Sequence, residues 1–191
     1  VQAEPRFLKD LRIASLEAGA LLIYDEIFCG LGRSGRYSFS EEFPCDLVCL
    51  GKALGGGFPL SACVGTDDAM SGWPESKGEA IHTGTFFGHP LSCRAARLTL
   101  EKMKTDDVCS AVLEKGDEFF GILSNLLESK ASVKEIRGRG FMIGIVLKDP
   151  GKAVEIFDQA RIRGLVVLPS GPMGDIISLT PALNCPANLL K

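Results

Sequence analysis

Apolar residues in the first hundred positions follow two different spacings. From Phe7 to Leu16 the spacing is near-helical and ends before Gly19, which predicts a helix followed by a C-terminal glycine. Three apolar runs of strand length come next: Ala20–Tyr24, Asp46–Leu50 and Ser61–Gly65. Buried strands that alternate with helices indicate an α/β protein with a mostly parallel sheet.

The second half of the chain begins with two helical patterns and then becomes more mixed. The helical spacings cover Pro90 to about Lys104 and Val108–Leu127, with a polar segment between them. The following pattern predicts strands at Val133–Ile136 and Phe141–Leu147, a helix at Lys152–Arg163 and a strand at Leu165–Leu168. We therefore expect a domain boundary after residue 104, with a small α+β domain over residues 105–191.

Composition excludes several classes of protein. The net charge of -3 and the scattered basic residues argue against a nucleic-acid partner. No apolar run approaches the roughly 20 residues that span a bilayer, so no membrane segment is predicted. The chain starts without methionine or signal peptide, which suggests a piece of a longer protein.

Seven cysteines, an odd number, lie mostly within apolar runs, as reduced thiols do. Reduced thiols favour a cytoplasmic location. Only Cys45 and Cys49 are close in sequence, and the chain has just two histidines, so no metal site is predicted.

Asp25 stands at the end of the first buried strand, where ligands collect in α/β sheets. A buried carboxylate at this position needs a cation or several hydrogen-bond donors. A helix cap or a structural ion pair would also explain it. The neighbouring Glu26 is expected to turn away into a structural contact.

Lys52 follows the second buried strand and precedes three glycines, Gly55–Gly57, that let the backbone approach a bulky ligand. A desolvated lysine at this position would have a lowered pKa and could attack a carbonyl to form an imine. A surface lysine at the start of a helix is the alternative.

Together, Asp25 and Lys52 meet the two needs of pyridoxal chemistry. The lysine holds the aldehyde, and the carboxylate keeps the ring nitrogen protonated. The released lysine can then move the proton of the substrate Cα as general base and acid.

Thr83, Gly84 and Thr85 form a small-residue loop before the helix at Pro90, and such loops bind anions such as phosphate. An ordinary helix cap fits the same residues. Gly30–Gly35 matches the G-x-G-x-x-G pattern of dinucleotide-binding turns, but its glycines begin well past the strand and no helix start follows. We therefore reject the dinucleotide site.

Three segments, Leu22–Gly35, Asp46–Pro59 and Thr85–Leu91, resemble the signature of class III pyridoxal-phosphate-dependent aminotransferases. The similarity continues through Ile136–Met142 and covers nearly the whole chain. It implies the C-terminal half of such an enzyme: half of a fold type I large domain over residues 1–104, followed by the small domain over residues 105–191. The family's usual last helix is not found after Asn184, so the resemblance implies that the small domain is incomplete at its outer edge.

The resemblance also implies roles for individual residues. Lys52 would form the Schiff base with pyridoxal 5'-phosphate, Asp25 would hold the pyridine nitrogen, and Ile27 would pack on one face of the ring. Thr85 matches a threonine that reaches the cofactor phosphate of the neighbouring subunit, so a homodimer is implied.

The chain departs from the family at three positions. Phe28 replaces a glutamine, His89 replaces an asparagine, and Ser178 stands where many relatives have an arginine that grips a substrate carboxylate. The glycine-serine or glycine-threonine phosphate loop of the family's first half is not in this sequence. Three functions therefore remain open: an aminotransferase, an aminomutase or racemase of the same fold, and a non-catalytic fragment.

Overall fold

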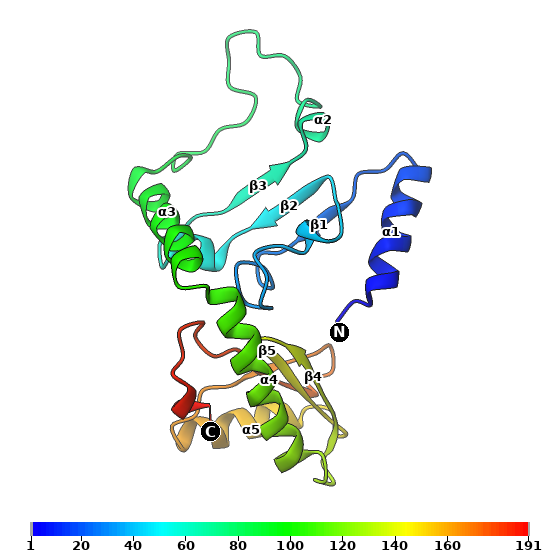
Figure 1. Cartoon of the computed structure of the whole chain (residues 1–191), viewed down its shortest axis with the longest axis vertical. Coiled ribbons are helices and arrows are strands. Elements are labelled where there is room, and N and C mark those ends of the chain that lie inside the picture. The colour runs from blue at the N-terminus through cyan, green and yellow to red at the C-terminus, as the bar shows by residue number, and fades with distance from the viewer. Residues whose placement is uncertain (1, 191) are drawn as a thin grey trace. The chain divides into compact units, whose positions relative to one another are not determined.

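The computed structural model describes residues 2–190, and their contacts divide the chain into two units. The first unit contains Ala3–Leu31 and Tyr37–Asp106 (Figure 1). The second contains Gly32–Arg36 and the chain from Asp107 onward. The first unit ends two residues past the predicted boundary, but Gly32–Arg36, which were expected in the first domain, belong to the second unit.

The first unit is built on a three-stranded sheet with the order β1-β2-β3. Its strands are β1 (Ile23–Asp25), β2 (Leu47–Leu50) and β3 (Ala62–Gly65). Strands β1 and β2 are parallel, whereas β2 and β3 are antiparallel. Half of the pairings in this sheet therefore differ from the mostly parallel arrangement that we expected.

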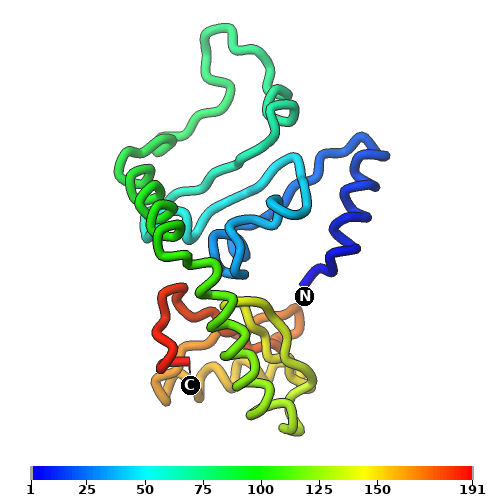
Figure 2. Tube along the Cα trace, viewed as in Figure 1, coloured from blue at the N-terminus to red at the C-terminus, as the bar shows by residue number. Residues whose placement is uncertain are grey.

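Helices and turns complete the first unit. Helix α1 (Pro5–Glu17) begins with a proline and ends before Gly19, whose φ of +61° suits glycine. The 3₁₀ turns η1 (Phe39–Glu41) and η2 (Lys52–Gly55) flank β2. Helix α3 (Pro90–Thr105) packs on η2, and a long segment joins it to the short helix α2, Asp67–Met70 (Figure 2).

The second unit has a four-stranded antiparallel sheet with the order β4-β5-β7-β6. The strands are β4 (Val133–Arg139), β5 (Met142–Leu147), β6 (Leu168–Ser170) and β7 (Ile176–Leu179). Helices α4 (Val108–Leu127) and α5 (Lys152–Ile162) pack on this sheet, and the 3₁₀ turn η3 (Ala187–Leu189) lies near the end of the chain.

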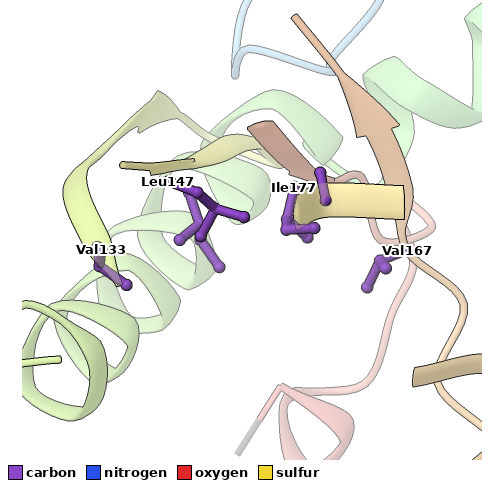
Figure 3. Close-up of a cluster of buried hydrophobic side chains, with 6 residues drawn as sticks. Val133, Leu147, Val167 and Ile177 are labelled. Atoms are coloured by element: carbon purple, nitrogen blue, oxygen red, sulfur yellow. The ribbon is translucent and has the colours of Figure 1, made fainter. Parts of the chain in front are cut away.

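Apolar side chains from strands and helices form the main core of this unit. Val133, Leu147, Val167 and Ile177 converge beside the sheet in Figure 3, together with Ile145 and Ala153. Helix α5 contributes Ala153, which is fully buried. The sheet and α5 therefore share one apolar layer, and its burial is a main source of the unit's stability.

Most predicted elements agree with the structure, although β1 starts three residues later than predicted and the short helix α2 was not predicted. The strand expected at Leu165–Leu168 is instead β6, which starts at Leu168, and Val166 is 79% exposed. Strand β7 was not predicted. Among residues 2–190, no helix is long and apolar enough to cross a membrane.

Candidate active site

Asp25 and Lys52 originate from the same edge of the first sheet. Asp25 is the last residue of β1 and pairs in register with Cys49 of the parallel strand β2. The N–H of Glu26 donates to the carbonyl of Cys49 at 3.0 Å and continues the pairing past the strand end. Lys52 follows Cys49 by three residues and opens η2. Since parallel strands end at a common edge, the two predicted site residues lie on neighbouring strand ends.

The Lys52 side chain is exposed and lies near an aromatic ring. Its Nζ is 5.4 Å from the centroid of the Phe28 ring, within the range of a cation–π interaction. The amine was expected to be desolvated, whereas Lys52 is exposed in this chain. The backbone of Lys52 has a φ of +45°, a left-handed conformation that is unfavourable for any residue other than glycine.

Asp25 is also exposed, so the expected burial of its carboxylate is wrong as well. Its Oδ1 accepts a hydrogen bond from the N–H of Ile27 at 3.1 Å. This local turn, typical of aspartate, holds the carboxylate at the strand end. Burial therefore does not force the carboxylate of Asp25 to pair with a cation.

Glu26 points into the protein instead, as the sequence predicts. It is only 3% exposed, and its Oε1 accepts hydrogen bonds from the hydroxyl of Ser38 at 2.7 Å and the N–H of Phe39 at 2.8 Å. A Cβ at Gly30 would lie 3.0 Å from its Oε2. Glu26 thus holds together the loop that leaves β1.

Ile27 lies against the backbone beside Lys52. A Cβ built on Gly51 would be 3.2 Å from Cγ2 of Ile27, so the missing side chain of Gly51 lets Ile27 approach the residue before Lys52. An amine, a carboxylate and an apolar side chain thereby share one sheet edge. An amine can hold an aldehyde, a carboxylate can hold a pyridine nitrogen and an apolar side chain can contact a flat ring, so these residues fit the ring part of pyridoxal phosphate.

Thr85 lies in an exposed turn segment before α3. The N–H of Phe87 donates to the carbonyl of Gly84 at 3.0 Å and closes a turn around it. His89 is the N-cap of α3, and its Nδ1 accepts a hydrogen bond from the N–H of Ser92 at 3.4 Å. The sequence left two interpretations of this segment open, a helix cap and a phosphate site. His89 provides the cap, and the phosphate role of Thr85 stays a prediction.

The glycine-rich segment after β1 forms turns, not the strand-to-helix turn of a dinucleotide site. The N–H of Gly32 donates to the carbonyl of Arg36 at 2.8 Å. Arg33 donates to the carbonyls of Phe141 at 3.2 Å and Pro181 at 2.5 Å, and burial lowers the pKa of its guanidinium. The sequence did not point to this role, since both partners lie more than a hundred residues further along the chain.

Ser178, where the resemblance implies an arginine in many relatives, belongs to β7. Its hydroxyl lies 2.6 Å from that of Ser170 on the neighbouring strand β6. A neutral hydrogen-bonded pair of hydroxyl groups therefore joins the two strands at this position. Within residues 2–190, no group of three or more histidine, cysteine, aspartate or glutamate side chains could hold a metal ion.

Comparison with known proteins identifies the family. The family model described as aminotransferase class-III matches residues 1–191. Acetylornithine aminotransferase from Xanthomonas campestris pv. campestris is 36% identical over 186 residues, which cover 95% of this chain and 44% of the relative. The enzyme of the same name from Methanosarcina mazei is 37% identical over 167 residues, covering 86% of this chain and 40% of the relative.

Among solved structures, N-acetylornithine aminotransferase from Stenotrophomonas maltophilia K279a is similar, with a TM-score of 0.82 and 32% identity. The match covers 98% of this chain and 48% of that one. The chain therefore spans somewhat less than half the length of the relatives it matches. Its mixed α/β architecture agrees with half of a fold type I enzyme. On these grounds, the chain belongs to the class III aminotransferase family.

Proposed function

We propose that this chain carries the lysine and the carboxylate of a pyridoxal-phosphate site in an aminotransferase. Such an enzyme moves an amino group between an amine or amino acid and a keto acid. The observation that supports this function most directly is the position of Asp25 and Lys52 on adjacent ends of two parallel strands. Family membership supports the reaction class.

In this proposal each residue at the sheet edge has one task. Lys52 would hold the cofactor through its Nζ, and the turn that fixes the Asp25 carboxylate would aim it at the ring nitrogen. Ile27 would supply an apolar contact for the ring. When bound, the pyridine ring withdraws electrons from the substrate Cα and so makes its proton acidic.

The exposed side chain of Lys52 is suited to transferring a proton. A flexible amine beside the substrate Cα can accept that proton and return it at another atom, which is general base and acid catalysis. The ring of Phe28, 5.4 Å from Nζ, would restrict the positions of the amine. We therefore assign the proton transfer to Lys52. Phe28 would contribute to the orientation of the amine.

Thr85 and a second subunit complete the proposed site. The segment around Thr85 is exposed, and two large apolar side chains next to it, Phe86 and Phe87, are 75% and 63% exposed. Exposed aromatic residues of this size are typical of an interface. This supports a homodimer in which Thr85 binds the cofactor phosphate of the other subunit.

For the amino donor, we propose an acetylornithine-like compound. The relatives named acetylornithine aminotransferase support this choice. Ser178 and Ser170 offer hydroxyl groups where an arginine would offer a charged fork, so the keto acid must be held by other residues.

The test of the cofactor site uses trapping by borohydride. Pyridoxal phosphate is added to the chain, the complex is reduced, and tryptic peptides are analysed by mass spectrometry. Attachment at Lys52 blocks cleavage there and joins the peptides 37–52 and 53–77. Lys52→Ala should abolish the adduct, whereas Lys77→Ala, at an exposed lysine, should retain it. An adduct that persists in Lys52→Ala would refute the assignment.

The reaction class needs a second measurement. With N-acetylornithine as donor, an aminotransferase passes the amino group to an added 2-oxo acid, and the new amino acid is detected by chromatography. An aminomutase or racemase would convert the donor without any transfer. A chain that binds the cofactor at Lys52 and converts nothing would be a non-catalytic fragment.

A further inference from the structure

Two of the seven cysteines lie directly opposite each other in the first sheet. Cys49 of β2 pairs in register with Cys63 of β3, and these strands are antiparallel. Side chains of directly opposite residues point to the same face of a sheet. The two thiols therefore project side by side from neighbouring strands.

The hydrogen bonds around β2 show which kind of pair this is. The N–H of Thr66 donates to the carbonyl of Asp46, the residue opposite it, at 3.0 Å. Hydrogen-bonded pairs alternate with non-hydrogen-bonded pairs, so Val48 with Val64 is hydrogen-bonded and Cys49 with Cys63 is not. Independently, the carbonyl of Cys49 accepts from Glu26 on the other side, away from β3.

A non-hydrogen-bonded pair brings its side chains closer than the other kind. The Cα atoms of such a pair are about 4.5 Å apart. Disulfides join cysteines whose Cα atoms are roughly 4.4 to 6.8 Å apart. The backbone of the sheet thus already holds Cys49 and Cys63 at a separation that a disulfide can bridge.

The surroundings of the two sulfur atoms agree with this geometry. Burial raises the pKa of Cys49, and Cys63 raises it further through charge repulsion and a hydrogen bond. Cys63 is exposed and Cys49 is half-buried, and both are free thiols. One sulfur is therefore open to an oxidant, and the other faces it from the sheet.

We propose that Cys49 and Cys63 form a dithiol site that a hydroperoxide oxidises to a disulfide. The exposed thiolate of Cys63 attacks the peroxide, becomes a sulfenic acid and releases hydroxide. The Cys49 thiol then attacks the Cys63 sulfur, forms the S–S bond and expels the hydroxyl group as water. Overall, two thiols and one hydrogen peroxide give one disulfide and two waters.

The location of this dithiol connects it to the candidate active site. Asp25, Cys49 and Cys63 form one row across the three strands, and repulsion from Asp25 also contributes to the raised pKa of Cys49. A disulfide would tie β3 to β2, the strand that leads into Lys52. The dithiol goes beyond the proposed function and does not depend on it.

The test is oxidation of the 191-residue chain by hydrogen peroxide, without cofactor, followed by thiol counting and peptide mapping. We expect two of the seven thiols to disappear and return with dithiothreitol. Trypsin should release the peptides 37–52 and 53–77 as one disulfide-linked species. The first peptide contains Cys45 and Cys49, and the second contains only Cys63.

Single serine variants identify the partner within the first peptide. Cys49→Ser and Cys63→Ser should abolish the linked species, whereas Cys45→Ser and the more distant Cys93→Ser should retain it. Linkage through Cys45, or peroxide that leaves both Cys49 and Cys63 as thiols or drives them only to sulfinic acid, would overturn the proposal. Peptide mapping of the unaltered chain distinguishes these outcomes even if a variant does not fold.

Discussion

Gly116 of α4 lies in direct backbone contact with Gly140, in the turn between β4 and β5. A Cβ at Gly116 would be 2.7 Å from the Cα, carbonyl carbon and oxygen of Gly140. Backbone atoms in a sheet turn cannot move aside as the end of a flexible side chain can. The close approach of the helix to the sheet therefore depends on the missing side chain.

The first prediction follows from this contact. Gly116→Ala should lower the free energy of unfolding by about 1–3 kcal/mol, because overpacking shifts the helix or the turn. Gly121→Ala on the same helix is the matched control, since a Cβ there meets nothing within 4 Å. The control should gain about 0.5–1 kcal/mol from helix propensity. Urea unfolding measures both, and equal stabilities would contradict the prediction.

The second prediction concerns the buried carboxylate of Glu26. Glu26→Ala removes the acceptor for the hydroxyl of Ser38 and the N–H of Phe39. We expect a loss of about 1–3 kcal/mol of unfolding free energy, since these partly buried donors lose the acceptor that the buried carboxylate provides. Glu41→Ala, at an exposed position close by, should change stability far less. A loss of similar size in both variants would mean that Glu26 has no special structural role.

The third prediction is a pH dependence that arises at Asp46. The guanidinium of Arg12, 2.6 Å away, and the N–H of Leu22, 2.7 Å away, hold the pKa of Asp46 below its ordinary value of 3.8. A carboxyl with a lower pKa in the folded state stabilises the fold above its unfolded-state pKa. This contribution is lost as the pH falls through the folded-state value.

The measurement is the free energy of unfolding between pH 7 and pH 2. The unaltered chain should lose part of its stability below about pH 4, whereas Asp46→Asn should be less stable at pH 7 and lose less in acid. Arg12→Ala should flatten the acid part of the curve in the same way, because it removes the same partner. Parallel curves for all three proteins would show that this pair does not contribute.

The fourth prediction addresses the proposed role of Asp25. Asp25→Asn can still accept the hydrogen bond from Ile27 but loses the negative charge. A charge-assisted hydrogen bond contributes about 1.5–3 kcal/mol, so pyridoxal-phosphate affinity should fall roughly 10- to 100-fold. Fluorescence titration measures this affinity, with Asp68→Asn as the control. Unchanged affinity would remove Asp25 from the proposed site.

The sequence predicts elements with a long apolar pattern better than short edge strands. Helix α4 has the predicted bounds because its apolar positions continue over five turns. Strand β6 is three residues long, contains Pro169 and lies at the edge of its sheet, where proline is tolerated. The apolar Val166 and Val167 just before it gave a stronger strand signal. Pairing with β7, which the sequence pattern does not encode, sets the true position.

For the candidate site, the sequence identifies residues but not their environment. Asp25 and Lys52 were expected to be desolvated because both follow apolar runs, yet both are exposed. Burial depends on what covers a strand end, and the local pattern carries no information about it. The role of Arg33 was missed for a similar reason, because its carbonyl partners come from distant parts of the chain.

The left-handed backbone of Lys52 lowers the stability of the fold at the position where the proposed reaction needs an amine. Glycine adopts a φ of +45° without penalty, whereas a residue with a side chain costs roughly 1–3 kcal/mol there. A chain with glycine at this position would therefore be harder to unfold and would have no amine at the sheet edge. The fold is thus less stable than its own backbone allows at the lysine that the proposed reaction uses.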